Sequence, residues 1–231
     1  MRLYAFAALT LLAACATATA QPSSPPAADA AASPVLAAIP PSSAASLNPA
    51  DAPSGAYTLD SRHVSAIWRI RHLGLSLFTA RFDTISGSLT WDGAHPENST
   101  LSISIAANSV NTGVLNAQGQ RAFDAEIANE VLGAEANPAI TFVSRAIQIT
   151  GPASGLITGD LTFNGVTRPA TLEATFEGGR FITFSGKHKL AFGARTIIRR
   201  SDFEAGFDNP LKNTAVSDEV EILIQAEFDK A

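Results

Sequence analysis

Asp60, Ser61 and His63 are the residue types of a hydrolytic triad, and they lie within four positions of one another. A triad is recognised by its geometry, however, and closeness in sequence does not establish that geometry. The sequence also lacks the Gly-x-Ser-x-Gly turn that exposes a nucleophilic serine in many hydrolases. The four histidines, at positions 63, 72, 95 and 188, do not have the spacing of a metal site. We therefore expect a protein that is not an enzyme and that uses neither a metal nor a cofactor.

Two other polar groups are candidates for contact with a ligand. His188 shares the parity of Phe184 and Phe192 in an alternating run, which would point it inward between two lysines. A histidine in such a place is more often satisfied by a backbone partner than by a ligand. The short run from Arg199 to Asp202 is either a solvated turn with a local ion pair or a site for an anionic group.

These residues must be positioned by strands, because alternation by two dominates the chain. In the segment SAIWRIRHLGLSLFTARF, residues 65–82, Ala66, Trp68 and Ile70 share one parity while Arg69 and Arg71 share the other, with Ile67 as the exception. Successive side chains of a strand point to opposite faces, so this pattern predicts two strands joined near residues 72–74, one face apolar and one wet. The same alternation recurs at Ile85–Trp91, Leu101–Ile105, Leu161–Phe163, Leu172–Phe176 and Val220–Phe228.

Turn signals separate these runs, and one helical segment interrupts them. Asn164–Gly165 is the strongest turn signal, because a type I′ hairpin turn needs positive φ at both central residues. In residues 114–132, Phe123, Ile127 and Val131 recur at spacings of four, which predicts one helix or two short ones. About eight antiparallel strands must then bury their apolar faces, either as two packed sheets or as a closed barrel. A small barrel encloses a packed core or a cavity for one ligand.

The first 15 residues predict an export signal, with a basic start followed by a short apolar run. Two processing sites compete there. LAAC resembles the lipobox of bacterial lipoproteins, in which Cys15 is lipidated and becomes the new N-terminus, whereas ATA before Gln21 suits ordinary signal peptidase. Cys15 is the single cysteine of the chain, so an internal disulfide is excluded and lipidation is the favoured explanation of its position.

The remaining chain divides into a tether and one domain. Residues 16–56 are almost wholly Ala, Pro and Ser, a composition that predicts a disordered tether. Residues 57–231 are then a single folded domain. The formal net charge of the chain is -5, and the domain has no basic run of the kind that binds nucleic acid.

Segments throughout the domain resemble the YceI family of exported bacterial proteins. The resemblance lies in YTLDSRHVSAIWRIRHLGLSLFTARFDTISGSLTWD, NPAITFVS, ITGDLTFNGVTRPATLEATF, RSDF and SDEVEILIQAEF, in this order. The sequence departs from the family pattern at Val131–Leu132–Gly133, where the family has an aromatic segment, and at Glu204, where the family has a glycine. The resemblance implies an all-β fold, an antiparallel lipocalin-like β-barrel of about eight strands with one helical insertion.

The resemblance also implies a function. We expect a cell-envelope protein that holds a polyisoprenoid, quinone-like lipid or another long-chain amphiphile inside the barrel, for transport or storage. Its partners would be that lipid and, through an acylated Cys15, the membrane; a homodimer is left open, and nucleic acid is not expected. We expect a periplasmic location, membrane-anchored as a lipoprotein or otherwise soluble. The alternative is a non-catalytic interaction or structural module with a solid-packed barrel. The expected ligand-binding residues are Trp68, Ile70, Phe78, Phe82, Phe142, Phe163, Phe176, Phe184, His188 and Phe192.

Overall fold

The computed structural model describes residues 45–231. The chain divides into two units, Met1–Ser42 and Ser43–Ala231. The predicted export signal, Cys15 and most of the predicted tether lie outside the described residues. Within residues 45–231, no helix is long and apolar enough to cross a membrane.

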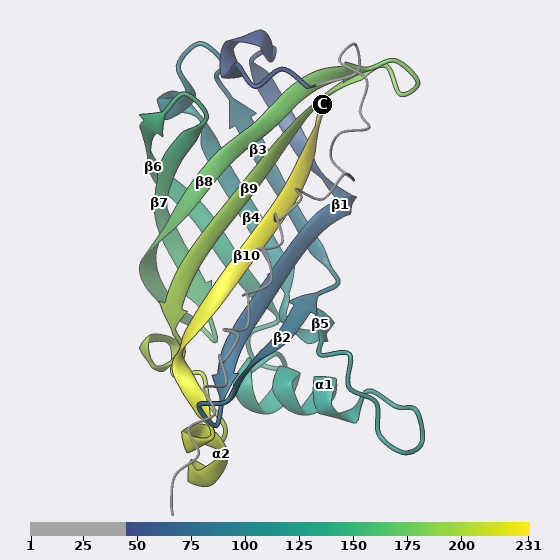
Figure 1. Cartoon of the computed structure of the whole chain (residues 1–231), viewed down its shortest axis with the longest axis vertical. Helices are drawn as coiled ribbons and strands as arrows, with labels where there is room; N and C mark the ends of the chain where they lie inside the picture. The colour runs from purple at the N-terminus through teal and green to yellow at the C-terminus, as the bar shows by residue number, and fades with distance from the viewer. Residues whose placement is uncertain (1–44) are drawn as a thin grey trace, which may run out of the picture. The chain divides into compact units, whose positions relative to one another are not determined.

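One antiparallel sheet closes on itself (Figure 1). Its strands are β1 Gly55–His72, β2 Ser76–Phe82, β3 Ile85–Trp91, β4 Thr100–Ala106, β5 Val110–Asn111, β6 Ala139–Gly151, β7 Ser154–Phe163, β8 Val166–Ile182, β9 Lys187–Arg199 and β10 Val216–Lys230. The strand order is β10-β9-β8-β7-β6-β4-β3-β1-β2-β5, and β10 also pairs with β1. That pairing closes a ring of eight strands within the described chain, with β2 and β5 as an extension from β1. The predicted all-β barrel of about eight strands is confirmed.

The long strand β1 changes partner along its length. Gly55–Thr58 pair with β3, whereas Ala66–His72 pair with β2. The two strands predicted within residues 65–82 are therefore the end of β1 and the whole of β2. The turn between them has positive φ at Leu73 (51°) and Gly74 (69°), which confirms the bend expected near residues 72–74.

The hairpin predicted at Asn164–Gly165 is also confirmed. Strand β7 ends at Phe163 and β8 begins at Val166, and these two residues pair with each other across the turn. The backbone has φ of 50° at Asn164 and 74° at Gly165. Both values lie in the left-handed region that a type I′ turn requires, and asparagine and glycine adopt this region more readily than other residues.

The helical insertion is shorter than predicted. Helix α1, Ala122–Glu126, leads directly into a π-helical turn, Ile127–Val131. The predicted start at residue 114 is wrong, because the Asn116 side chain accepts hydrogen bonds from the backbone N–H groups of residues 118 and 120 and holds a loop there. The buried carboxylate of Asp124 accepts a hydrogen bond from the Thr112 N–H at 2.9 Å and another from the Thr112 hydroxyl, which ties α1 to the end of β5.

The segment that precedes β1 is ordered. Ser46 exchanges two backbone hydrogen bonds of 2.9 Å with Gly179 of β8, and a 3₁₀ turn, Pro49–Asp51, follows. Asn48 caps this turn through its side-chain oxygen, which accepts from the Ala50 N–H. The prediction that the disordered tether continues to residue 56 is therefore wrong for residues 45–56. An asparagine cap before a proline at the first position of a turn is a local signal that composition alone does not reveal.

Residues 200–214 form a cap at the other end of the barrel, and a polar side chain lies at the centre of this cap. It contains a 3₁₀ turn, Arg200–Phe203, and helix α2, Pro210–Thr214. The guanidinium of Arg200 lies at its centre and donates hydrogen bonds to the carbonyl oxygens of Ser217 and Ala205, at 3.0 and 3.2 Å, and to Asn213 Oδ1, at 2.9 Å. The Arg199–Asp202 run thus contributes an internal donor to this cap.

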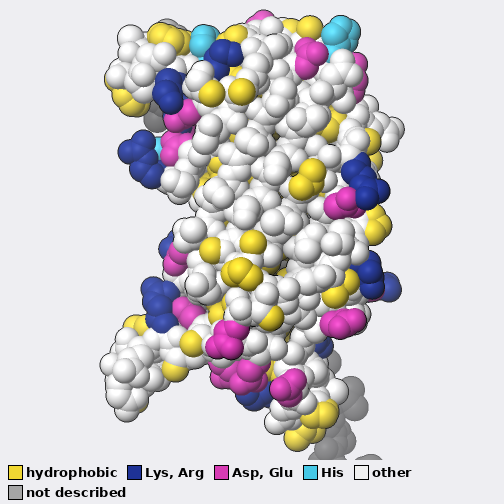
Figure 2. Space-filling model, turned by 180° about the vertical axis from the view of Figure 1, so that it is seen from behind, with side chains coloured by type: hydrophobic (Ala, Val, Ile, Leu, Met, Phe, Trp, Pro, Cys, Tyr) yellow, Lys and Arg dark blue, Asp and Glu magenta, His cyan; other side chains and the backbone are white. Residues whose placement is uncertain are grey.

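The outer wall is polar, as the alternation predicts. Arg69 pairs with Glu221 at 2.6 Å, and Arg81 pairs with Asp83 at 2.8 Å. On the face shown in Figure 2, basic and acidic side chains are interspersed, and the described residues form no continuous basic patch there.

Candidate functional site

Two cavities lie end to end inside the barrel. The upper cavity, at the end that holds the turn Pro49–Asp51 in Figure 1, has a volume of about 800 Å³. The lower cavity, at the end that holds α1 and α2, has a volume of about 440 Å³. Each volume falls within the range of roughly 300–1,000 Å³ that is usual for small-molecule sites. Strand residues supply most of the lining of both, with turn residues added in the upper cavity and residues of α1, the π-helical turn and the cap added in the lower one.

Four aromatic residues cluster in the lining of the upper cavity. Trp91 of β3 stacks on Phe176 of β8, with 5.7 Å between the ring centroids and 11° between the planes. Phe192 of β9 meets both rings edge-on, at 5.6 and 5.4 Å, and Phe228 of β10 meets Phe192 at 6.0 Å. These are the preferred arrangements of aromatic pairs. The cavity therefore has an ordered aromatic surface contributed by four different strands.

The lower cavity combines strand and helix residues. Trp68 of β1 contacts Phe78 of β2, with ring centroids 6.0 Å apart, and Phe78 meets Phe123 of α1 edge-on at 6.1 Å. Ile127 and Val131 of the π-helical turn complete this side. The spacing of four predicted the apolar face of this helical segment, and the structure shows that this face lines the lower cavity.

The two cavities meet at a belt of side chains near the middle of the barrel. The belt consists of the residues that line both cavities: Ala66, Ile103, Ile105, Leu172 and Ile224. All five are apolar, so nothing in the belt would hydrogen-bond a ligand. A lipid chain longer than one cavity would have to pass between these side chains.

Eight of the ten predicted ligand-binding residues line these cavities, and whether they bind a ligand stays a prediction. Trp68, Ile70, Phe78, Phe82, Phe142 and Phe163 line the lower cavity, and Phe176 and Phe192 line the upper one. The other two, Phe184 and His188, line neither, and their predicted inward position is wrong. Phe184 lies in the turn between β8 and β9 and is 94% exposed.

The error has a physical cause. Strands β8 and β9 extend past the fully buried Leu190 toward the turn that joins them. In this extension the alternation of side chains continues, but neither face of the hairpin borders the barrel interior. His188 therefore keeps its predicted parity and packs against Phe181 of the same hairpin, with ring centroids 5.1 Å apart.

Three further lining residues have the same inward parity or helical spacing but were not among the predicted ligand-binding residues. Trp91 and Phe228 have the inward parity in their strands, and both belong to the upper aromatic cluster. Phe123 follows from the spacing of four in the helical segment. The Ile and Leu residues of the belt carry the same period, but the sequence does not distinguish them from an ordinary core.

Polar groups are sparse inside the barrel. Among the described residues that line the upper cavity, Glu97 is the single ionisable one; its side chain is half exposed and pairs with His95 at 3.4 Å. The indole Nε1 of Trp91 is buried and has no hydrogen-bond partner, and the same is true of Trp68 Nε1 in the lower cavity. The lower cavity also touches Arg200, whose guanidinium is taken up by the cap. The interior thus suits an apolar guest.

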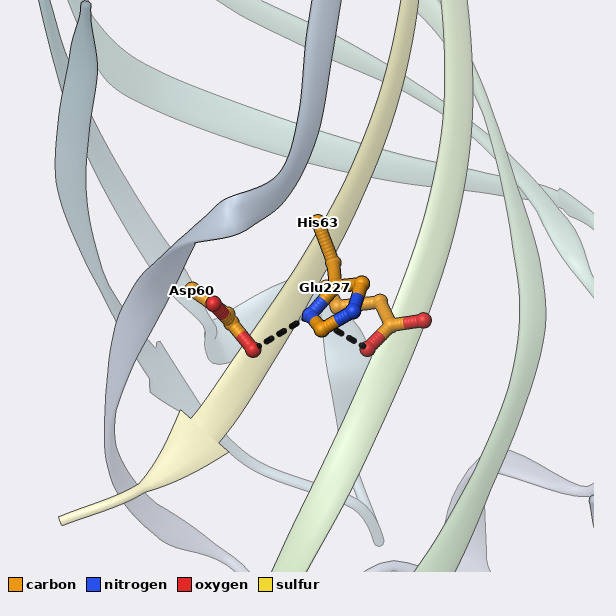
Figure 3. A group of neighbouring side chains, drawn as sticks. All are labelled: Asp60, His63 and Glu227. Atoms are coloured by element: carbon orange, nitrogen blue, oxygen red, sulfur yellow. Dashed lines mark hydrogen bonds and ion pairs between the residues drawn. The ribbon is translucent and has the colours of Figure 1, made fainter.

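A contrasting polar cluster lies on the outer wall. Between Leu59 and Val64, the four residues 60–63 of β1 face only Glu227 of β10, so β1 bulges there. The bulge brings together residues from three strands, some of them shown in Figure 3. His63 Nδ1 lies 2.8 Å from Asp60 Oδ2, and Lys189 Nζ of β9 lies 2.6 Å from the same oxygen. Lys189 Nζ also pairs with Glu227 at 3.1 Å and with Asp229 at 2.8 Å.

One ammonium group is shared by three carboxylates in this cluster. Burial alone would raise the pKa of the Asp60 carboxyl, but hydrogen bonds from Lys189, His63 and the Arg62 N–H hold that pKa well below its usual range. Burial alone would lower the pKa of Lys189, but its bonds to Asp229, Asp60 and Glu227 raise it well above its usual range. Both groups are therefore charged throughout the neutral range, and they link β1, β9 and β10.

The same cluster contains the geometric elements of two kinds of site. Asp60, His63 and Glu227 offer ligand atoms within 4.8 Å of one another, as a metal site would. The Lys189 ammonium, however, already binds the carboxylates of Asp60 and Glu227. Asp60 and His63 also form the acid–base half of a triad, but within the described chain no hydrogen bond joins His63 to Ser61, which is exposed. The arrangement is best explained as an ion cluster that stabilises the wall.

The comparison with known proteins concerns the barrel as a whole. The sequence model of the YceI-like domain matches residues 57–228. The chain belongs to the YceI family. A UPF0312 protein of Pseudomonas putida (strain GB-1) is 34% identical over 160 residues, which cover 68% of this chain and 80% of the relative.

Solved structures of YceI-like barrels resemble this one. A Campylobacter jejuni YceI protein superposes with a TM-score of 0.59 at 26% sequence identity, covering 70% of this chain and 90% of that protein. A structure described as a polyisoprenoid binding domain from Saccharophagus degradans superposes with a TM-score of 0.56 at 17% identity, covering 76% of this chain and 98% of that domain. The second likeness, at this identity, concerns the fold.

Proposed function

We propose that this protein binds a long-chain lipid, in the first place one with an isoprenoid chain, inside the barrel. The observation that carries the proposal is the pair of apolar cavities placed end to end, which together form an elongated interior. Membership of the YceI family and the structural likeness to a polyisoprenoid binding domain support the same ligand class. Transport or storage of this lipid is the corresponding role.

The driving force is the removal of the chain from water. Each CH₂-sized group that leaves water contributes about 0.8 kcal/mol, and this contribution needs no directed polar contact. A lining made of phenylalanine, leucine and isoleucine side chains provides such an environment. The alternative of a solid-packed interaction module requires a filled interior, and the two cavities argue against it.

The cellular setting is part of the proposal. The export signal in the first 15 residues and the lipobox ending at Cys15 support a periplasmic protein anchored to the membrane through an acylated cysteine. A protein held near a membrane is well placed to receive a lipid from it. The intact mass of the mature protein tests this part: an acylated Cys15 at the N-terminus is expected, and an unmodified chain beginning at Gln21 would contradict the anchor.

Native mass spectrometry of the protein purified from its own cell envelope tests the ligand. We expect a one-to-one adduct, and organic extraction of the same sample would identify its chain. The adduct should persist in Phe184→Asp, whose side chain is outside both cavities, and disappear in Phe163→Asp, whose side chain lines the lower one. If Phe163→Asp fails to fold, Phe78→Asp at the edge of the same cavity replaces it. A clean mass that does not change after incubation with isoprenoid quinones would overturn the proposal.

A further inference from the structure

We infer that residues 46–51, which we call the strap, form the gate of the upper cavity, and that a lipid enters and leaves the barrel past them. The inference rests on the proposed lipid-binding function and adds the route of exchange to it. Figure 1 shows the strap at the upper rim of the barrel. It lies outside residues 57–228, which match the YceI-like domain, so the strap is not part of the matched family domain.

The strap forms one side of the cavity mouth. Asn48, Pro49 and Ala50 line the upper cavity, although they precede the first long strand. The other sides of the mouth are formed by the loop after β3, which contributes Pro96, and by the turn between β6 and β7, which contributes Pro152. Movement of the strap away from the barrel would therefore widen the mouth without a change in the sheet.

The strap is held to the barrel at its two ends. At its start, Ser46 exchanges two backbone hydrogen bonds of 2.9 Å with Gly179, which lies past the last residue of β8 that pairs with β7. Directly after its end, Ala52 is 6% exposed and packs in the core. Loss of the two backbone bonds would free the strap to turn about Ala52 while the core stays packed.

Internal hydrogen bonds allow the strap to move as one piece. Ser46 Oγ donates to Asp51 Oδ2 at 2.6 Å, and Asn48 Nδ2 donates to Asp51 Oδ1 at 3.0 Å. These bonds join parts of the strap to each other and not to the barrel. A segment that keeps its shape when it detaches has little conformational entropy to lose when it returns, so the strap can open and close repeatedly.

A glycine in the loop after β3 permits the close approach of the strap. A side-chain carbon at Gly93 would lie 2.5 Å from the Ala52 carbonyl oxygen, 2.9 Å from the Pro49 carbonyl oxygen and 3.2 Å from Trp91 Nε1. The two shortest distances are to the backbone at the end of the strap and just after it, so a larger residue would push this segment outward. Gly93 is not among the glycines with positive φ, so its replacement acts through this contact and not through backbone strain.

The lower end of the barrel is a less favourable exit. There the π-helical turn and the cap place Ile127 and Phe203 in the core, where they are 6% and 2% exposed. Opening this end would transfer such apolar side chains to water, which is unfavourable. The strap, all of which the structure describes, contains no buried residue, so its detachment has a smaller cost.

The experiment measures exchange rates in the full mature chain, with geranylgeranyl quinone as the probe. Binding is followed by quenching of tryptophan fluorescence in a stopped-flow instrument, and excess geranylgeraniol displaces the bound quinone to give the off-rate. We expect Gly93→Ala to raise both the on-rate and the off-rate at least about fivefold, as for the loss of contacts worth one hydrogen bond. The affinity should change much less, because a gate acts on entry and exit alike.

Two asparagine caps provide a matched pair of variants. Asn48 caps the turn of the strap ahead of Pro49, and Asn209 caps α2 at the lower end ahead of Pro210 in the same way. Asn48→Ala should loosen the strap and raise the off-rate about threefold, as for the loss of one cap. Asn209→Ala removes the same kind of cap at the other end of the barrel and should leave the off-rate unchanged.

Hydrogen–deuterium exchange of residues 45–52 in the same samples shows whether the strap has been released. If Gly93→Ala does not fold or does not release the strap, Ser46→Pro replaces it, because proline lacks the N–H that bonds to Gly179. A released strap with unchanged exchange rates, or an off-rate that rises in Asn209→Ala instead, would overturn this inference while lipid binding stands. If the wild type does not bind the quinone at all, the proposed function fails, and the gate fails with it.

Discussion

Strands β1, β9 and β10 build two opposite environments on the two sides of one stretch of wall. Leu59, Leu190 and Phe228 face the interior and are almost completely buried among apolar neighbours. The residues next to them in sequence, Asp60, Lys189 and Glu227, meet on the outside in a cluster of charges. Alternation by two is what allows one strand to serve both environments.

The residues whose types suggest catalysis or metal binding lie on the outer wall, whereas the residues proposed to bind the lipid line the interior. Asp60, His63 and Glu227 have the types and distances of a catalytic or metal site, yet the Lys189 ammonium already pairs with both of the carboxylates. The interior offers a large and mostly apolar surface. In this barrel the charged outer cluster links three strands, and the apolar interior is the proposed place of the ligand.

Removal of the central cation should have the largest effect. In Lys189→Met, the buried Asp60 carboxylate and its two acidic neighbours lose their common partner. We expect a loss of about 3–5 kcal/mol in the free energy of unfolding, as for other buried ion pairs broken on one side. Urea denaturation at neutral pH measures it. Lys187→Met, at an exposed position two residues away, is the matched control and should change the stability by less than about 0.5 kcal/mol. Equal effects of the two substitutions would show that the cluster does not stabilise the wall.

The acid dependence of stability should become weaker in the same variant. In the wild type the pKa of Asp60 is lowered on folding, so its contribution is present above the usual carboxyl pKa of 3.8 and is lost as the pH falls through the folded value. Stability should therefore decrease on acidification below about pH 4. Without Lys189, the hydrogen bonds from His63 and the Arg62 N–H remain but the strongest pKa-lowering partner of Asp60 is gone, so folding lowers the pKa of Asp60 less and the variant loses less stability as the pH falls.

Urea midpoints at pH 7.5, 5.5 and 4 test this dependence. The difference in stability between wild type and Lys189→Met should stay constant from pH 7.5 to 5.5 and narrow toward pH 4. A constant difference down to pH 4 would mean that the variant is destabilised by lost packing of the lysine chain rather than by unpaired carboxylates. At the alkaline end, the raised pKa of Lys189 keeps the wild-type contribution intact up to the usual lysine pKa of 10.5, and the contribution is lost at higher pH as the lysine deprotonates.

A change on the interior side should affect binding more than stability. Ala170 of β8 lines the lower cavity, and Ala170→Phe would fill part of its volume. We expect the affinity for a geranylgeranyl quinone to fall about tenfold, equivalent to about 1.4 kcal/mol, because the inserted ring takes up volume that the lipid would fill. The matched control is Phe184→Ala in the exposed turn, which should leave this affinity unchanged. An unchanged affinity in Ala170→Phe would show that the lipid does not use the lower cavity.

The sequence predicted the interior far better than the outer cluster. Period-two alternation is local, so it identified the strands, the Asn164–Gly165 turn and eight lining residues without knowledge of the fold. It placed Phe184 and His188 wrongly because parity does not tell where the wall ends. The outer cluster depends on the four-residue bulge 60–63 and on residues more than 120 positions apart in the chain, and no local pattern encodes that meeting. The division into two cavities likewise depends on how distant strands pack.

The smallest expected effect is at His63, and it tests whether the outer cluster is purely structural. The side chain of His63 is half exposed, and Asp60 keeps Lys189 as a partner when His63 is removed. His63→Ala should therefore lower the free energy of unfolding by less than about 1 kcal/mol, the usual range for an exposed ion pair.

Zinc binding gives a second test of the cluster, because a metal bound at Asp60, His63 and Glu227 would stabilise the folded state in proportion to its affinity. Addition of Zn²⁺ should change neither the melting temperature of the wild type nor that of His63→Ala. A rise in the wild type alone would show that zinc displaces the Lys189 ammonium, and the cluster would then be a metal site.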